Sequence, residues 1–340
     1  MLRRIIASAL AALLAVAAIA GVRPRLKYLE SEPRDGYTCH LIEYNVTGGE
    51  RVQAYLLIPK GEGRHPGLVL LHDHGARFDI GKEKLVKPLA SAQEHIQRSS
   101  EQWIRDNFDG EWFGDRLARE GYVVIVPDML YWGSRSTEAC RRWSRATFGS
   151  ESLSPAEIKA LKNEVYEGQR AVYDSLAAKG VIWAEQTLKE DAQAARVLAG
   201  LKQVDSRRIG AFGWSMGAHR AWLLTAFCDR IKAGCALSWM TLKALQKEPY
   251  SASEYSMLIP RLRDKMDFPD IAALLKPKPF YFLSGTEDKL FPAEAVTTCY
   301  TRMQQIYGPD SPLLTEFFPG PHHCGSDVQN RIVEWFAHSL

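Results

Sequence analysis

The sequence predicts an α/β fold in which helices cover both faces of a mainly parallel β-sheet. Strand-like and helix-like segments alternate along the chain, and several of the strand-like segments are continuous apolar runs, as expected for strands buried on both faces. The 340 residues are 46% hydrophobic and 24% charged, which is enough for one large core. We therefore expect a single domain over residues 30–340, with helical insertions near 77–112 and 134–180.

The first twenty residues differ in composition from the rest. Arg3 and Arg4 precede the apolar run 5–17, and the small residues Ala18 and Ala20 follow it. This order predicts a secretory signal peptide over residues 1–20 and export to the periplasm or beyond the cell. The alternative is a retained anchor, because residues 5–22 approach the length of a membrane-spanning helix. Contact with a membrane is expected only in that case.

Charge and cysteine content exclude several classes of protein. The 43 Lys and Arg residues are interspersed with 40 Asp and Glu residues, so no basic stripe marks a nucleic-acid surface. The six cysteines are widely spaced and form no CxxC pair, which argues against a disulfide scaffold. Most of them are expected to be small buried side chains, although export would permit one or two bridges.

The N-terminal half of the domain is expected to begin with a hairpin, because Thr47-Gly48-Gly49 separates two strand-like segments. A buried strand follows as a continuous apolar run, and then the first insertion, which is polar and helix-prone. The expected elements are strands at Tyr37–Val46, Arg51–Pro59, Gly67–Leu71 and Tyr122–Pro127, and a helix at Phe113–Glu120.

The C-terminal half repeats the order of strand and helix. A long, mostly helical region over 154–201 has Pro155 and Glu157 near its start and Gly200 at its end. The elements expected after it are strands at Arg208–Gly213, Ile231–Trp239, Lys278–Leu283 and Leu313–Phe318, and helices at Met216–Cys228, Ala293–Tyr307 and Ser326–His338. Residues 241–276 show no clear pattern.

A serine stands at one of these strand-to-helix junctions, in Gly213-Trp214-Ser215-Met216-Gly217. On such a sharp turn a serine can present its hydroxyl at the carboxyl end of the sheet, and glycines two positions before and after it remove Cβ atoms that would clash. Ser215 is therefore the predicted nucleophile. An ordinary turn with a capping serine is the alternative.

Two backbone amides are candidates for stabilising an oxyanion. Met216 opens the helix after the serine, where free amides and the positive end of the helix dipole lie. The second donor is expected from the loop after the strand Gly67–Leu71. Ala76 is the first choice in that loop and Gly75 the second.

The acid and the base should follow the serine in that order along the chain. Asp288 directly follows an apolar strand and is the predicted acid, with Glu287 as the alternative. The base is expected on the turn-rich loop after the last strand, which carries His322 and His323. His323 is favoured because many hydrolases of this type show Gly-x-x-His here, and Gly320 has the required spacing; His322 is the alternative.

Several tryptophans lie where they could line a cleft. Trp132 and Trp214 are the principal candidates for contact with a substrate, and Trp143 and Trp183 lie in insert segments. Packing in the core is the competing interpretation for each of them.

These motifs together resemble the dienelactone hydrolase-like branch of the α/β-hydrolase superfamily, and within it the acetylxylan-esterase-like proteins. The resemblance covers most of residues 37–340. Its matching stretches are Leu71–Ala76, Pro127-Asp128 with Gly133, the serine turn, Phe268-Pro269-Asp270, Gly285–Pro292 and Gly320–His323. One departure is that dienelactone hydrolases proper use a cysteine nucleophile, whereas this chain has a serine.

The resemblance implies the α/β-hydrolase fold and hydrolysis of a carboxylic ester without a metal or an organic cofactor. The expected partner is a small-molecule or carbohydrate ester, with acyl groups on sugars as one candidate. A serine peptidase of the oligopeptidase type and a non-catalytic binding protein with this fold are the alternatives. The pattern His72-Asp73-His74 would suit a metallohydrolase, but the further ligands expected soon after it are absent.

Overall fold

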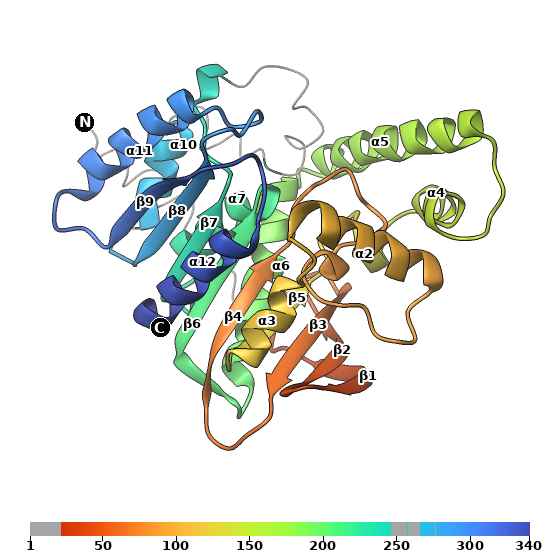
Figure 1. Cartoon of the computed structure of the whole chain (residues 1–340), viewed down its shortest axis with the longest axis horizontal. Coiled ribbons are helices and arrows are strands. Elements are labelled where there is room, and N and C mark those ends of the chain that lie inside the picture. The colour runs from red at the N-terminus through yellow and green to blue at the C-terminus, as the bar shows by residue number, and fades with distance from the viewer. Residues whose placement is uncertain (1–21, 246–256, 258–265, 276) are drawn as a thin grey trace.

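The computed structural model describes residues 22–245, 257, 266–275 and 277–340, and its centre is one twisted nine-stranded sheet (Figure 1). The strands lie in the order β1-β2-β3-β5-β4-β6-β7-β8-β9. Pairing is antiparallel from β1 through β3 to β5 and parallel from β5 to β9. The strands are β1 (Leu26–Arg34), β2 (Tyr37–Asn45), β3 (Arg51–Pro59), β4 (His65–Leu71), β5 (Val123–Pro127), β6 (Val204–Trp214), β7 (Ala233–Leu237), β8 (Phe280–Gly285) and β9 (Leu313–Phe318).

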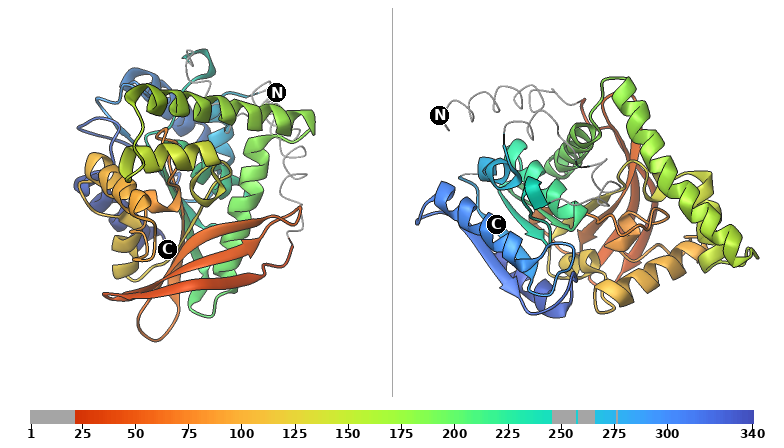
Figure 2. Two further views of the ribbon diagram at one scale, coloured as in Figure 1. Left: turned by 90° about the vertical axis from the view of Figure 1, so that its right-hand side faces the viewer. Right: turned by 90° about the horizontal axis from the view of Figure 1, so that it is seen from above.

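Helices cover both faces of this sheet, which confirms the predicted fold class (Figures 1 and 2). The helices α2, α3 and α12 contribute to the core on one face, and α6, α7 and α11 to the core on the other. The α-helices are α2 (Glu94–Asn107), α3 (Phe113–Arg119), α4 (Glu138–Phe148), α5 (Pro155–Ala178), α6 (Trp183–Gly200), α7 (Met216–Phe227), α10 (Phe268–Ala272), α11 (Ala293–Tyr307) and α12 (Ser326–Ser339). Short 3-10 turns are η1 (Lys82–Lys84), η2 (Gly133–Arg135), η3 (Lys243–Leu245) and η4 (Ala273–Leu275).

Apart from shifts in element boundaries, two differences from the predicted elements stand out. Strand β1 was not predicted, because it lies at the edge of the sheet and most of its side chains are exposed, so its sequence has no apolar periodicity. The long helical region is two helices, α5 and α6, separated at Gly180, whose φ of 68° ends the helical path. Ser154 and Glu157 form a capping box at the start of α5.

The inserted segments form one group beside the carboxyl ends of the parallel strands. The first insertion contains η1 and α2, and the second contains α4 and α5, which lie together in Figure 1. The predicted signal segment 1–20 and much of 241–276 lie outside the described residues.

The six cysteines are free thiols and all of them are buried. None of the helices that the structure describes is long and apolar enough to cross a membrane.

The two glycines of the serine turn are required by close backbone approach. A Cβ atom on Gly217 would lie 1.8 Å from the Leu71 carbonyl oxygen, and one on Gly213 would lie 1.9 Å from the Gly217 carbonyl oxygen. Both obstacles are backbone atoms, which cannot rotate away as a side chain can. Only glycine at these two positions therefore allows β4, β6 and α7 to pack this closely.

We expect Gly217→Ala to destabilise the fold by about 3 kcal/mol or more, because β4 and α7 must separate to admit the methyl group. Gly200→Ala is the matched control, since a Cβ there meets no atom within 4 Å. Thermal unfolding of the two variants measures the difference. Equal melting temperatures for both would contradict the close packing described here.

Candidate active site

Ser215 stands at the turn between β6 and α7 in a strained backbone conformation. Its φ is 55° and its ψ is −124°, which a residue other than glycine rarely adopts. The Ser215 amide donates to the Leu237 carbonyl oxygen at 2.8 Å, and the Ser215 carbonyl accepts from the Ala218 amide at 2.8 Å. These bonds and the two glycines hold the turn, so the strained residue faces the carboxyl end of the sheet. This is the geometry of the predicted nucleophile turn.

Asp288 lies after β8 and is fully enclosed. Its Oδ1 accepts hydrogen bonds from the amides of Leu290 (2.8 Å) and Phe291 (3.0 Å), which fixes the orientation of the carboxylate. Its Oδ2 lies 2.7 Å from Nδ1 of His322. Glu287, the alternative acid, is exposed. The structure therefore joins the predicted acid to a histidine.

That histidine is His322, the alternative base, and the favoured His323 does not contact Asp288. The Nε2 atom of His323 lies 2.8 Å from Oδ1 of Asp109, on the loop after α2. The imidazole of His322 is instead flanked by two aromatic rings, with centroids 5.2 Å away at Trp214 and 5.8 Å away at Phe291. The spacing from Gly320 did not decide between the neighbours, because Asp109 comes from the first insertion, which the sequence could not place against this loop.

Ser215 and His322 line the same pocket, whose volume is about 250 Å³. The remaining polar lining comes from Asp73, His74 and Asn107, and the loop residues Gly75 and Ala76 complete that side. The apolar lining is Trp103, Trp214, Met216, Trp239, Met257, Leu290 and Phe291. The sequence therefore identified the centre of the pocket but missed most of its walls.

The two tryptophans singled out for substrate contact have different places. Trp214 lines the pocket, as expected. Trp132 does not: it is completely buried, and its Nε1–H donates to the carbonyl oxygen of His74 at 3.2 Å. Trp143 and Trp183 are also buried. The ring of Trp132 therefore belongs to the core, and its indole N–H contacts the loop after β4.

Gly75 and Ala76, the two candidates for the second oxyanion donor, differ in whether the amide is already hydrogen-bonded. The Ala76 amide is already engaged, since it donates to Nδ1 of His74 at 3.1 Å. The Gly75 amide has no acceptor among the described residues, and Gly75 lines the pocket. Met216, which carries the other predicted donor, is the first residue of α7 and also lines the pocket.

The direction of the Gly75 N–H is set by the hydrogen bonds to the carbonyl oxygen of His74, which belongs to the same peptide group. The carbonyl oxygen of His74 accepts from Nζ of Lys84 at 2.8 Å and from Trp132. In a trans peptide the N–H points opposite to the carbonyl. Lys84 and Trp132 therefore direct the Gly75 N–H away from themselves.

Lys84 is fully buried and has three acceptors on this loop: the carbonyl oxygens of Asp73 and His74 and the Asp73 carboxylate. The Asp73 carboxylate at 3.2 Å balances its charge, and burial raises the pKa of Asp73. Nothing in the sequence pattern distinguished Lys84 from a surface lysine. Its role follows from the fold, which turns the first insertion back over the loop.

A second buried ion pair fixes the helix that begins at the serine turn. Arg220 of α7 contacts Asp191 of α6 through Nε (3.0 Å) and Nη2 (2.7 Å), and its Nη1 donates to the His72 carbonyl at 3.4 Å. Both side chains are nearly inaccessible to solvent. The pair therefore ties α7, α6 and the loop after β4 together.

Comparisons with known proteins identify the family to which this chain belongs. The profile of the dienelactone hydrolase family matches residues 107–324. A curated relative, described as "Putative hydrolase YtaP" from Bacillus subtilis (strain 168), is 26% identical over 286 residues, which are 82% of this chain and 79% of that protein.

Solved structures share the fold at low sequence identity. A "putative acetyl xylan esterase" from Bacteroides fragilis NCTC 9343 superposes with a TM-score of 0.64 at 17% identity, over 93% of this chain and 75% of the other. Acetyl xylan esterase 1 from Thermoanaerobacterium sp. JW/SL YS485 gives a TM-score of 0.57 at 16% identity, over 97% and 93%. The family match spans more than half of the chain, and it includes the serine turn, Asp288 and His322. The chain is therefore a member of the dienelactone hydrolase family, within the α/β-hydrolase superfamily.

Proposed function

We propose that this protein hydrolyses carboxylic esters through an acyl-enzyme on Ser215. The proposal rests on the contact between Asp288 and His322, and on the fact that His322 and the strained Ser215 line the same pocket. A buried carboxylate on Nδ1 of a histidine fixes the tautomer whose Nε2 can accept a proton. Family membership and the esterases among the structural relatives support the same reaction class.

The reaction takes place in two stages. Ser215 Oγ attacks the ester carbonyl while His322 Nε2 takes the hydroxyl proton, and Asp288 stabilises the imidazolium. The tetrahedral oxyanion accepts from the amides of Met216 and Gly75. Collapse breaks the ester C–O bond, and His322 returns its proton to the leaving alcohol. A water molecule, deprotonated by His322, then attacks the acyl-enzyme and releases the acid and free Ser215.

The walls of the pocket favour a short acyl group on a hydroxylated alcohol. Trp239 and Phe291 belong to the core on one side of the sheet, and Trp103 and Trp214 to the core on the other. The polar lining from Asp73, His74 and Asn107 favours a ligand with hydroxyl groups that can bond to these side chains. An acetylated sugar has both features.

An ester panel tests this proposal. We expect p-nitrophenyl acetate and xylose tetraacetate to be hydrolysed, p-nitrophenyl dodecanoate to react at least about tenfold more slowly because the pocket is small, and alanyl-proline p-nitroanilide to be inert. Diisopropyl fluorophosphate should label the wild-type chain on the peptide that contains Ser215.

Three outcomes separate the candidates. Cleavage of the anilide in preference to the esters would favour the peptidase instead. An unlabelled chain that hydrolyses none of the substrates would favour a non-catalytic protein of this fold. Preference for the long acyl chain would refute the substrate class while leaving the mechanism intact.

A further inference from the structure

Helix α5 of the second insertion contacts the loop after β4 at two points. Nζ of Lys162 donates to the carbonyl oxygen of Ala76, and Oε1 of Gln169 lies 3.3 Å from Nε2 of His74. The two residues are seven positions apart, which is two helical turns, so both lie on one face of α5. That face therefore lies along the loop that supplies one of the proposed oxyanion donors.

The surroundings of Lys162 make this contact specific. Its Nζ lies 3.8 Å from the ring centroid of Trp143 and less than 6 Å from those of Phe78 and Tyr166. Burial lowers the pKa of Lys162 to about 8. Among the described residues, the only hydrogen-bond acceptor of Nζ is Ala76 O. Ring faces compensate only part of the lost hydration of an ammonium group, so the carbonyl of Ala76 is the polar contact that fixes this side chain.

Gln169 determines how His74 can bond. Burial and the nearby Lys84 lower the pKa of His74 to about 3, so its ring is neutral, with one donor and one acceptor nitrogen. Since Nδ1 accepts from the Ala76 amide, Nε2 carries the proton and donates to Gln169. Gln169 thus selects the tautomer in which Nδ1 of His74 accepts from the Ala76 amide. The Gly75 amide then remains available to the pocket.

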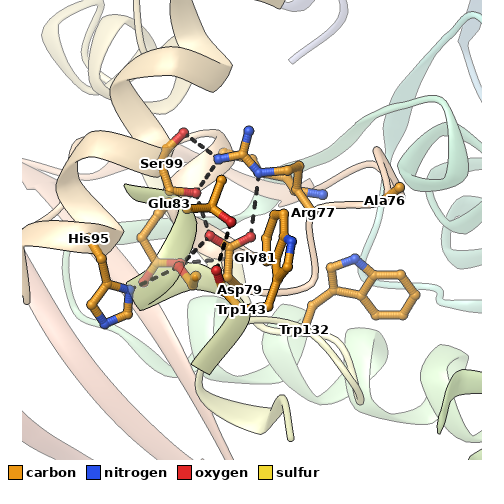
Figure 3. Close-up of polar contacts among 12 residues, drawn as sticks. Ala76, Arg77, Asp79, Gly81, Glu83, His95, Ser99, Trp132 and Trp143 are labelled. Carbon is orange, nitrogen blue, oxygen red and sulfur yellow. Dashed lines mark hydrogen bonds and ion pairs between the residues drawn. The ribbon is translucent and has the colours of Figure 1, made fainter. Parts of the chain in front are cut away.

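The far side of the same loop is held by a cluster of hydrogen bonds to two other helices, so α5 contacts a segment that is also anchored at its other end. Figure 3 shows Arg77 and Asp79 turned toward Ser99 of α2, with Trp143 of α4 beside them. Arg77 donates to the Ser99 carbonyl at 2.9 Å, and the buried Asp79 accepts from the hydroxyls of Ser99 and Ser144. This cluster joins the loop to both α2 and α4.

We propose that α5 sets the geometry of the oxyanion hole, with Lys162 and Gln169 as its positioning residues. The inference rests on the proposed function, because it concerns the Gly75 amide as an oxyanion donor. Neither residue is among those that line the pocket, so we expect neither to contact the substrate. Their loss should therefore weaken stabilisation of the transition state while substrate binding is retained.

The first experiment compares Lys162→Met with Lys159→Met, which removes an exposed lysine from the same helix. We expect Lys162→Met to lower kcat for p-nitrophenyl acetate by about 10- to 100-fold with KM changed less than about twofold. Its inhibition constant for trifluoroacetophenone, which forms a tetrahedral adduct with the serine, should rise by a similar factor. Lys162→Arg should recover most of the lost kcat, because it keeps a cationic donor.

The second experiment uses the other contact and holds even if Lys162→Met does not fold. Gln169→Leu removes the acceptor of the His74 proton, whereas Gln169→Glu keeps it. We expect kcat to fall about tenfold or more for the first and clearly less for the second, again with little change in KM.

The inference is overturned if wild type is active and both Lys162→Met and Gln169→Leu match the Lys159→Met control in kcat and in affinity for the ketone. It is also overturned if KM carries the loss while the ketone binds as in wild type. If wild type neither hydrolyses esters nor reacts with diisopropyl fluorophosphate, the proposed function fails and the inference falls with it.

Discussion

Ser215→Ala is expected to lower kcat/KM for p-nitrophenyl acetate by about 10⁴-fold or more, leaving only what the pocket and its amides contribute without a nucleophile. In the proposed mechanism the hydroxyl forms the covalent bond to the acyl group, so no neighbouring side chain can replace it. The variant should also fail to react with diisopropyl fluorophosphate. Mass spectrometry of the labelled chain and initial rates measure the two effects.

Ser206→Ala is the matched control for this prediction. It removes an exposed serine from the same strand, β6, far from its carboxyl end. Wild-type rates are expected for it. If Ser215→Ala retained more than a tenth of the wild-type rate, the ester would be hydrolysed by another group and the acyl-enzyme mechanism would be wrong.

The second large effect separates the two adjacent histidines. His322→Ala should lower kcat/KM by about 10⁴-fold, because the proton of Ser215 then has no acceptor and Asp288 has no imidazolium to stabilise. His323→Ala removes only the contact with Asp109, which is half exposed, and should change the rate by less than about threefold. Initial rates of both purified variants under identical conditions give the comparison.

This pair is its own control, since the substitutions are identical and adjacent. A large loss in His323→Ala together with near wild-type activity in His322→Ala would show that the base approaches Ser215 by a different arrangement of the loop after β9. Comparable circular dichroism spectra are needed for both variants, because the loop also carries Cys324, whose amide donates to Asn107.

The predicted site residues that the structure places as expected were recognisable from local geometry. The serine turn requires glycines at fixed offsets, and Gly213 and Gly217 meet backbone atoms at less than 2 Å in the structure if a Cβ is added. Asp288 was also recognisable, because an acid directly after a buried strand lies at the carboxyl edge of the sheet. The sheet itself followed from apolar runs, except for β1, whose exposed edge position leaves no such signal.

The parts that the sequence did not predict depend on where the insertions pack. His322 and His323 are adjacent on one loop, and only the position of Asp109 and Asp288 distinguishes them. Trp132 looked like a cleft residue, yet its indole supports His74 from the core. Lys162 lies 86 residues from Ala76 along the chain, so no local pattern could have connected the two.

The positive φ of Ser215 also has a consequence for directed evolution of this enzyme. A backbone held near φ 55° suits glycine better than any residue with a Cβ, and such strain is of the order of 1–3 kcal/mol. A library selected only for heat resistance should therefore enrich glycine at position 215 and so accumulate well-folded, inactive proteins. Selection for thermal stability in this scaffold has to be coupled to turnover at every round.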